Sequence, residues 1–244
     1  MKLSVVIPAY NEEGSIAQTL NSLYQTLVKH AIPHEIFVTN DNSKDRTASI
    51  LLALQQTIPT LHFETNHGPN GFGYAVRYGL ERYQGDCVAV MMADLSDDPE
   101  DLVLFYNKML EGDYDCVFGS RWDKGGKVYD YPKVKKVINR IANLIVKVLF
   151  RLNYNDCTNA FKLYKRGTMD GIKPFLSPHF NLTLELPLKA IVRGYNYAIV
   201  PNSWTNRTSG ESKLKIKEMG SRYFFIMMYC LIERFFSRGD FKKK

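Results

Sequence analysis

Short apolar runs alternate with helical repeats along the first half of the chain. Residues 3–7 are apolar apart from one serine, and residues 14–29 carry apolar side chains at helical spacing, at Ile16, Leu20, Leu23 and Leu27. A continuous apolar run predicts a buried strand, and a spacing of three or four residues predicts an amphipathic helix. The chain is therefore expected to open with a strand followed by a helix.

The same alternation continues to residue 121. Further strands are predicted at residues 35–39, 61–63, 86–92 and 116–118, and further helices end near residues 54, 83 and 110. Strands and helices that alternate at this length predict an α/β fold, in which a mostly parallel sheet carries helices on both faces. In such a fold a ligand binds at the carboxyl ends of the strands.

Polar residues follow these strand ends, where one ligand could contact several of them. They are Glu12, Asp41, Asn66, the turn at residues 71–73, Asp94 and Arg121. The glycines of the turn allow backbone amides to approach a phosphate, although a plain turn explains them equally well. A nicotinamide enzyme is disfavoured, because residues 8–12 read Pro-Ala-Tyr-Asn-Glu where a Gly-x-Gly-x-x-Gly would follow the first strand.

The apolar run at residues 87–92 leads directly into four carboxylates. They are Asp94, Asp97, Asp98 and Glu100. Hard oxygen ligands at the carboxyl end of a strand suit Mg²⁺ or Mn²⁺. The alternative is a polar turn in which Asp98 caps a helix with Pro99 at its first position.

Length limits the number of domains, and cysteine content indicates the cellular compartment. At 244 residues the chain is long enough for one α/β domain or a domain with an appendage. Its four cysteines lie far apart, mostly within apolar runs, which predicts core thiols in a reducing, cytoplasmic setting rather than a zinc site or disulfides. They are Cys87, Cys116, Cys157 and Cys230.

The net charge of +7 is concentrated in two basic segments. Residues 121–151 carry nine Lys and Arg against two acids, and residues 211–244 carry nine against four, so the rest of the chain is acidic. Basic segments attract the phosphates of nucleic acids, lipid head groups or small substrates. Because no nucleic-acid-binding motif is recognisable, we expect a phosphorylated ligand or a membrane surface and no nucleic acid.

Each basic segment contains a predicted helix with an apolar face. Between residues 136 and 151 the polar positions are 136, 140, 143, 147 and 151, which form one stripe of an amphipathic helix. Within residues 219–236 the continuous apolar part is shorter than the roughly 20 residues that span a membrane. We expect this helix to lie in the membrane interface, with residues 242–244 on anionic lipid. The alternatives are core packing for the first helix and a homo-oligomer contact for the second.

Several motifs in combination resemble glycosyltransferase family 2, whose members have the GT-A fold. They are Ser4-Val-Val-Ile-Pro-Ala-Tyr-Asn-Glu-Glu13, Asn40-Asp-Asn-Ser-Lys-Asp-Arg-Thr47, residues 66–79, Met92-Ala-Asp-Leu-Ser-Asp-Asp-Pro-Glu100 and Gly119-Ser-Arg121. Residues 156–164 and 207–214 resemble the dolichol- and polyprenyl-phosphate sugar transferases of that family. The resemblance covers about residues 3–215.

This resemblance implies a domain organisation. A Rossmann-like GT-A domain would occupy residues 1–215, and a C-terminal amphipathic helix with a basic tail would occupy residues 216–244. Within the domain, residues 121–152 would form a basic amphipathic segment that contacts the acceptor and the membrane.

The resemblance also implies a donor site on the first strand ends. The residues that would contact the nucleotide are Pro8, Tyr10, Glu12, Asp41, Ala93 and Asp94. Met92-Ala93-Asp94 stands where the family has an Asp-x-Asp element that binds a divalent cation, and a thioether does not replace a carboxylate for Mg²⁺. Asp94 would therefore be the principal ligand of Mg²⁺ or Mn²⁺, with Ser96 as a second ligand. Asn40 is another departure, because relatives commonly have Asp there.

The remaining site residues come from the two basic segments. Arg207, Ser212 and Lys213 match a family loop that closes over the donor and acceptor phosphates. Arg207 and Lys213 would act in catalysis by offsetting charge on the departing nucleotide. The residues implied to hold the acceptor phosphate are Arg121 with Lys136 or Arg140, together with Ser212, and Lys135 is a competitor.

The activity implied is inverting transfer of a hexosyl group from a GDP- or UDP-linked sugar to a dolichyl or undecaprenyl phosphate. It would take place at the cytoplasmic face of a membrane, with the protein peripheral or monotopic. A phosphate monoester is ionised at neutral pH, since its second pKa is ~6, so direct displacement needs no general base. A saccharide hydroxyl acceptor would need one, for which Glu185 is the candidate. A catalytically weak, nucleotide-binding subunit is a third interpretation.

Overall fold

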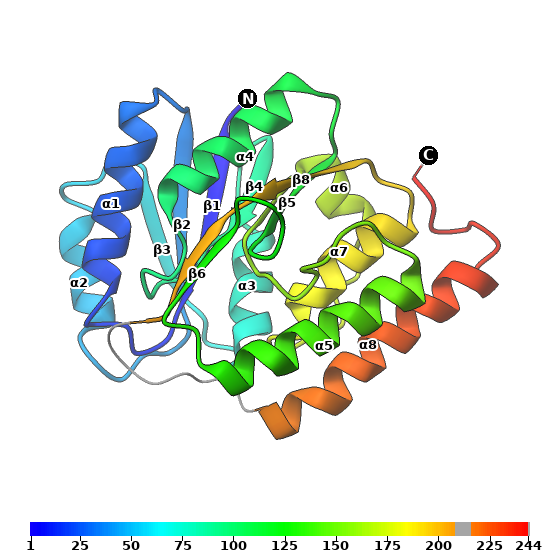
Figure 1. Cartoon of the computed structure of the whole chain (residues 1–244). Helices are drawn as coiled ribbons and strands as arrows, with labels where there is room; N and C mark the ends of the chain where they lie inside the picture. Colours follow the sequence, from blue (N-terminus) through cyan, green and yellow to red (C-terminus); the bar gives the residue numbers. More distant parts are fainter. Residues whose placement is uncertain (208–215, 244) are drawn as a thin grey trace.

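The computed structural model describes residues 1–207 and 216–243 and contains one large mixed sheet (Figure 1). Its strand order is β3-β2-β1-β4-β7-β5-β8, and β7 is antiparallel to β4 and β5 whereas the other pairs are parallel. The strands are β1 (Leu3–Ala9), β2 (His34–Asn40), β3 (Leu61–Thr65), β4 (Cys87–Val90), β5 (Cys116–Ser120), β7 (Lys162–Lys165) and β8 (Tyr197–Pro201). A separate parallel ribbon pairs β6 (Lys127–Tyr129) with β9 (Ser203–Thr205).

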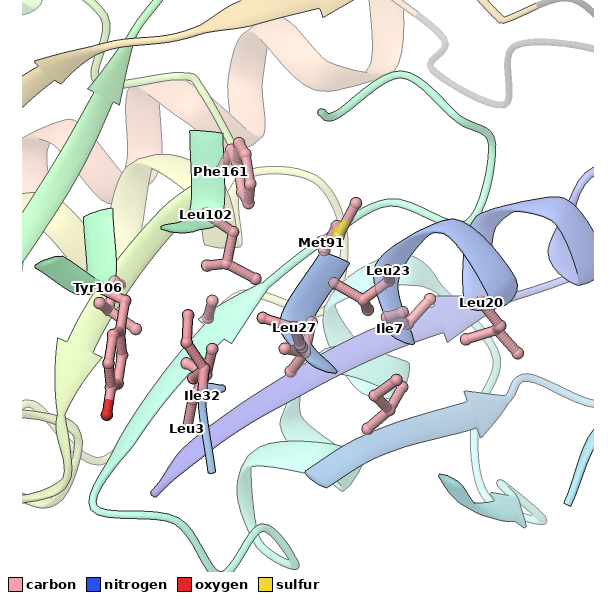
Figure 2. Close-up of a cluster of buried hydrophobic side chains, with 14 of the residues drawn as sticks. Leu3, Ile7, Leu20, Leu23, Leu27, Ile32, Met91, Leu102, Tyr106 and Phe161 are labelled. Atoms are coloured by element: carbon pink, nitrogen blue, oxygen red, sulfur yellow. The ribbon is translucent and has the colours of Figure 1, made fainter. Parts of the chain in front are cut away.

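Helices cover both faces of the sheet, as the alternating pattern predicts. The helices are α1 (Ile16–Lys29), α2 (Thr47–Leu54), α3 (Phe72–Leu80), α4 (Pro99–Glu111), α5 (Lys133–Phe150), α6 (Arg166–Gly171), α7 (Leu182–Val192) and α8 (Ile216–Phe236). Neighbouring residues of a strand point to opposite faces. Val5 and Ile7 therefore join one core cluster with α1, α2 and α4, part of which Figure 2 shows, while Val6 joins a second cluster. That second cluster contains residues of α3 and α5–α8.

The elements predicted from residues 3 to 121 are confirmed, with shifts of a few residues at their ends. All four cysteines are buried, as predicted for core thiols. The antiparallel β7 was not predicted, because its sequence Lys-Leu-Tyr-Lys reads as half polar. Lys162 is nevertheless buried, and its ammonium donates to the carbonyls of Cys157, Asn159 and Thr183. This burial lowers the pKa of Lys162 to about 7.

The order of the strands places a ligand cleft beside β1 and β4. The chain passes from β1 outward to β2 and β3, and then returns through α3 to β4 on the other side of β1. Loops that leave neighbouring strands in opposite directions open a crevice at the carboxyl end of the sheet. The segments that leave β1, β2 and β4 at this end contain Tyr10, Asp41 and Asp94, so these residues lie on the rim of that crevice.

The last helix is built into the fold rather than appended to it. Ile226 and Cys230 of α8 are fully buried in the second core cluster. Arg193, just after α7, forms a buried ion pair with Glu233 of α8, with N–O distances of 2.7 and 2.9 Å. Arg234 of α8 donates to the carbonyl of Phe150, so the C-terminal ends of α8 and α5 are joined, and the two helices run side by side in Figure 1.

Candidate active site

A cavity of about 380 Å³ lies at the carboxyl ends of β1 and β2. Four of the residues predicted to bind a nucleotide, Pro8, Tyr10, Glu12 and Asp41, line it, as does Met92. The other lining residues are Ala9, Asn70, Gly71, Phe72, Ala75, His179, Phe180 and Arg222. We call this cavity the nucleotide pocket. The other two predicted nucleotide-binding residues, Ala93 and Asp94, do not line it. The Ala93 side chain is buried in the first core cluster and its carbonyl accepts a hydrogen bond from Thr19.

Asp41 organises the pocket wall through both of its carboxylate oxygens. Oδ1 accepts a hydrogen bond from the amide of Asn66 at 3.0 Å, and Oδ2 accepts one from the backbone N–H of Gly71 at 2.8 Å. Each carboxylate oxygen has a further lone pair, so the group still has acceptor capacity toward the cavity. The Asn40 side chain, which stands where relatives commonly have Asp, bonds to Ser43 and Thr65 and does not line the pocket.

Gly71, just before α3, and Gly73, in the first turn of α3, allow close packing against the loop before α7. A Cβ on Gly73 would lie 2.5 Å from the carbonyl oxygen of Ser177 and the carbonyl carbon of Pro178. Gly71 has a φ of +146° and faces the same segment. The turn therefore packs directly on residues 177–179, which carry His179 into the pocket wall.

Glu12, Asp94 and Arg207 meet beside the nucleotide pocket. Nη2 of Arg207 lies 2.8 and 3.0 Å from the two carboxylate oxygens of Glu12 and 3.3 Å from Oδ2 of Asp94. All three side chains are nearly buried, with 12–13% of each exposed. The carboxylates of Glu12 and Asp94 thus converge on one cationic nitrogen of Arg207. Their combined negative charge would also favour a small cation at this place. Ser212 and Lys213, which were predicted to act beside Arg207, lie outside the described residues.

A divalent cation fits this pair of carboxylates as part of a larger coordination shell. Mg²⁺ is usually held by one or two carboxylates and completed by water and substrate phosphates. Within residues 1–207 and 216–243, no group of three or more His, Cys, Asp or Glu side chains could hold a metal without a substrate. Ser96 was predicted as a second ligand, but it is buried and lines a different cavity beside α4 and the β6–β9 ribbon. Glu12 is the carboxylate that lies near Asp94, since both contact Nη2 of Arg207.

The other carboxylates of the acidic loop have structural roles. Asp97 is buried and accepts the backbone N–H of Met92 at 2.9 Å, and this burial raises the pKa of Asp97 to about 7. Asp98 caps α4 by accepting the N–H of Glu100 at 2.9 Å, with Pro at the first helical position. The metal interpretation therefore fits Asp94, and the helix-cap interpretation fits Asp98.

The cations predicted to hold an acceptor phosphate gather around one tryptophan. The charged groups of Arg121, Lys136 and Arg140 lie 5.6, 5.6 and 5.2 Å from the ring centre of Trp122. Arg121 is already committed, because its guanidinium forms a buried, two-point ion pair with Asp156 at 2.7 and 2.8 Å. Lys136 and Arg140 are exposed at the start of α5 and leave their charge accessible.

A second cavity, which we call the apolar groove, runs between α5 and α8 with a volume of about 360 Å³. Most of its wall is apolar, and its polar residues include Lys135, the alternative acceptor ligand, and Asn139. The lining residues are Tyr131, Lys135, Ile138, Asn139, Ala142, Ile145, Val146, Thr158, Leu184, Gly220, Tyr223, Phe224 and Met227.

Helix α5 leaves most of its apolar residues exposed, together with Lys136, Arg140 and Lys147 of the polar stripe. Asn143 of the polar stripe is 2% exposed and bonds to Thr158, whereas Val134 and Val148 are 70% and 65% exposed. The apolar residues of α5 that face outward are Val134, Val137, Ile138, Ile141, Leu144, Ile145, Val148 and Leu149. On α8 they are Phe224, Phe225, Met228, Ile232, Phe235 and Phe236. Helix α5 packs on the core through Val146 and Phe150, so the core-packing alternative holds for one side of the helix and not for its exposed apolar residues. Within the described ranges, no helix has the length and apolar character needed to span a membrane.

Glu185 is not placed to act as a general base. Its carboxylate is fully buried and accepts the backbone N–H groups of Leu176 and Ser177 at 2.8 and 2.7 Å, and the ammonium of Lys189 at 2.6 Å. It contacts neither the nucleotide pocket nor the apolar groove. Its role is to hold the loop before α7, so the suggestion that it deprotonates a hydroxyl acceptor is corrected.

The sequence analysis missed the part of the pocket wall contributed by the loop before α7 and by α8. Phe180 stacks on Phe72 with ring centres 4.3 Å apart, and His179 and Arg222 line the same cavity. The available signal in the sequence was Phe72, which belongs to the recognised turn at residues 71–73. Residues 174–181 carry no motif, and Arg222 reads as the polar boundary of an apolar helix.

Sequence comparisons find related proteins over most of this chain. The model for the family Glycosyl transferase family 2 matches residues 4–172. A dolichol-phosphate mannosyltransferase of Pyrococcus furiosus is 30% identical over 221 residues, which cover 89% of this chain and 60% of that protein. An undecaprenyl-phosphate mannosyltransferase of Micrococcus luteus is 30% identical over 221 residues, which cover 88% of each. The chain thus spans less than two thirds of the first relative and most of the second.

Solved structures show the same fold at lower identity. Glucosyl-3-phosphoglycerate synthase from Mycobacterium tuberculosis, in complex with Mn²⁺, uridine diphosphate and phosphoglyceric acid, has a TM-score of 0.71 and 19% identity. The match covers 96% of this chain and 78% of that one. From the family match, the relatives and the shared architecture, this chain belongs to glycosyl transferase family 2 and has the GT-A fold.

Proposed function

We propose that this protein transfers a hexosyl group, with inversion, from a nucleoside diphosphate sugar to a polyprenyl phosphate at a membrane surface. The two mannosyltransferase relatives act with dolichol phosphate and undecaprenyl phosphate, according to their names, which supports this acceptor class. The four buried, free thiols support the cytoplasmic face of the membrane. GDP- and UDP-linked donors both fit the proposal.

The observation that carries the proposal is the position of the apolar groove beside the nucleotide pocket. Arg222 lines the nucleotide pocket and the next residue, Tyr223, lines the groove, so α8 separates the two cavities. An isoprenoid chain is apolar and would bury surface against the groove, which favours binding by about 25 cal/mol per Å². A saccharide acceptor would need many hydrogen-bonding groups there, and the groove wall offers few.

The proposed chemistry needs an electrophilic sugar, an ionised acceptor and positive charge that offsets the negative charge of the departing nucleoside diphosphate. Asp94 and Glu12 would hold a divalent cation, which offsets negative charge on the donor diphosphate when bound. Arg207 would contact the same diphosphate through its forked guanidinium. The acceptor phosphate is already anionic at neutral pH, so attack on the anomeric carbon needs no protein base. Single displacement inverts the configuration at that carbon.

Lys136, Arg140 and Lys135 would hold the acceptor phosphate from the basic end of α5. Lys136 and Arg140 keep accessible charge near Trp122, and Lys135 lies at the groove. Arg121 would act indirectly by placing Trp122 and the adjoining backbone through its pair with Asp156. Ser212 and Lys213 remain part of the proposal from the family motif alone.

Transfer should require a polyprenyl phosphate, and this requirement tests the proposed function. We would first identify the donor by measuring the shift in unfolding temperature with each nucleotide sugar and Mn²⁺. Radiolabelled donor would then be supplied with undecaprenyl phosphate, dolichyl phosphate, the parent alcohols or 3-phosphoglycerate. We expect label in the polyprenyl phosphates and none in the alcohols, which lack the ionised oxygen. Efficient transfer to 3-phosphoglycerate or to a sugar hydroxyl would overturn the acceptor assignment.

The outward apolar faces of α5 and α8 should bind lipid vesicles. Changing Ile141 and Leu144 of α5 to Asp places two charges on that face, where the native side chains are 53% and 59% exposed. Each apolar side chain that is removed should cost about 1.5–3 kcal/mol of binding free energy. The two changes together therefore predict a fall in vesicle affinity of roughly 100-fold or more. Cosedimentation with vesicles containing anionic lipid measures this directly. Raising the salt concentration should weaken wild-type binding without abolishing it, because only the electrostatic part is screened.

A matched control lies on the other side of the sheet. Leu52 of α2 and Leu104 of α4 are 60% and 52% exposed, and both helices cover the opposite face. Changing both to Asp should leave vesicle binding unchanged. Equal binding by wild type and the Ile141/Leu144 variant would contradict the membrane proposal and favour a subunit contact, which analytical ultracentrifugation would detect.

A further inference from the structure

The second turn of α8 contributes consecutive residues to two different cavities. Successive residues of a helix point about 100° apart, so one helix edge can form a partition. Arg222 lines the nucleotide pocket, while Gly220, Tyr223 and Phe224 line the apolar groove. The helix assigned to the membrane surface is therefore also a wall of the donor site.

Arg222 brings a positive charge to a cavity whose other strongly charged lining residues are acidic. Those residues are Glu12 and Asp41, and the described contacts pair them with other groups: Glu12 with Arg207, and Asp41 with Asn66 and Gly71. Arg222 is partly buried, and among the residues that the structure describes it has no carboxylate partner. A guanidinium in this position is suited to bind phosphate oxygens at two points.

Side-chain contacts fix α8 against the pocket wall. The hydroxyl of Tyr223 lies 3.2 Å from the carbonyl oxygen of Phe180, to which it donates, and 3.3 Å from Oγ1 of Thr183. The ring of Phe180 stacks on Phe72, and both rings line the nucleotide pocket. The helix that carries Arg222 is thus held in register with the loop before α7. Preorganisation of this kind lowers the cost of ordering the charged side chain when a ligand binds.

We propose that Arg222 binds a phosphate of the nucleoside diphosphate, so that α8 forms part of the donor site as well as the membrane surface. This inference rests on the proposed function only in taking the cavity as the donor pocket, and it does not depend on the acceptor. The double role of α8 also couples the two ligands. Because Tyr223 lines the groove next to Arg222, an acceptor in the groove would restrict the Arg222 side chain further, and the two binding events would strengthen each other reciprocally.

The direct test measures the affinity of GDP and UDP, each with Mn²⁺, by isothermal titration calorimetry in detergent. Arg222→Ala should lower the affinity for the nucleotide that the wild type binds by about tenfold or more. This is the usual effect of losing a charge-assisted contact to phosphate. Arg222→Lys keeps the positive charge but loses the forked guanidinium, so its affinity should lie between those of the wild type and Arg222→Ala. Ser221→Ala, at the exposed neighbouring position, should match the wild type. Unfolding temperatures measured without ligand would confirm that all variants remain folded.

The outcomes of the calorimetry distinguish a failure of this inference from a failure of the donor-pocket assignment. A wild type that binds nucleotide with an affinity unchanged in Arg222→Ala would overturn this inference and leave the proposed function standing. A wild type that binds neither nucleotide would overturn the donor pocket and this inference together. Repeating the titration with vesicles containing polyprenyl phosphate tests the coupling. We expect tighter nucleotide binding in the wild type and a smaller gain in Arg222→Ala, and an equal gain in both would refute the role of Arg222 in the coupling.

Discussion

Asp94→Asn is expected to lower turnover by about 10²–10³-fold, the range seen when a preorganised electrostatic contact to a developing charge is lost. The change preserves the shape of the side chain and its ability to accept the N–H of Ser96, which lies 3.2 Å from Oδ1. It removes the negative charge that would hold a divalent cation and that now faces Arg207 at 3.3 Å. The defect should appear in kcat at saturating donor and persist at high Mn²⁺.

The same acidic loop supplies the control for this prediction. Asp98→Asn removes a charge four residues away, where the exposed carboxylate caps α4. An Asn is also a good N-cap, so stability should change by a few tenths of a kcal/mol and turnover should stay near that of the wild type. Near-normal turnover in Asp94→Asn at saturating Mn²⁺, or an equal loss in both variants, would contradict the assignment of Asp94.

Glu185→Gln is expected to destabilise the fold by about 3–5 kcal/mol, because it breaks a buried ion pair and leaves the Lys189 ammonium without its counter-charge. Both side chains are fully buried. The backbone N–H groups of residues 176 and 177 bond to different carboxylate oxygens, so in a glutamine of the same orientation one of them would face an amide NH2 donor. Urea unfolding monitored by circular dichroism measures the loss.

A double variant separates structure from catalysis at this position. Glu185→Gln combined with Lys189→Met removes the unpaired buried charge and should recover part of the lost stability. If Glu185→Gln instead unfolds at the wild-type urea concentration and binds nucleotide normally, but transfers no sugar, Glu185 is a catalytic base rather than a support for the loop before α7.

The sequence predicted the first five strands of the large sheet because those segments are continuous apolar runs separated by helical repeats. It also predicted that polar residues at the strand ends meet, since parallel strands share a carboxyl edge, and the nucleotide pocket brings Glu12 and Asp41 together. The site could be located at this edge before the side-chain contacts were known.

Other features depend on partners that periodicity cannot identify. Arg121 was expected to hold a phosphate, and the sequence does not show that Asp156, 35 residues later, binds the Nε and Nη2 groups of its guanidinium. The periodicity of α5 shows that its two faces differ without showing which one meets the protein, and the structure turns Asn143 inward. Glu185 reads as a surface residue because its partners are two backbone amides and a lysine one helical turn away.

The division of the core into two clusters sets an order for folding during synthesis. The cluster beneath α1, α2 and α4 has its last buried member at Leu163, so its residues are all available well before the chain is finished. The cluster on the opposite face needs Ile226 and Cys230. Because nascent chains generally fold from the N-terminal end, one side of the sheet can close early. The other side stays incomplete until α8 has left the ribosome, so the two faces of the sheet would close at different times during synthesis.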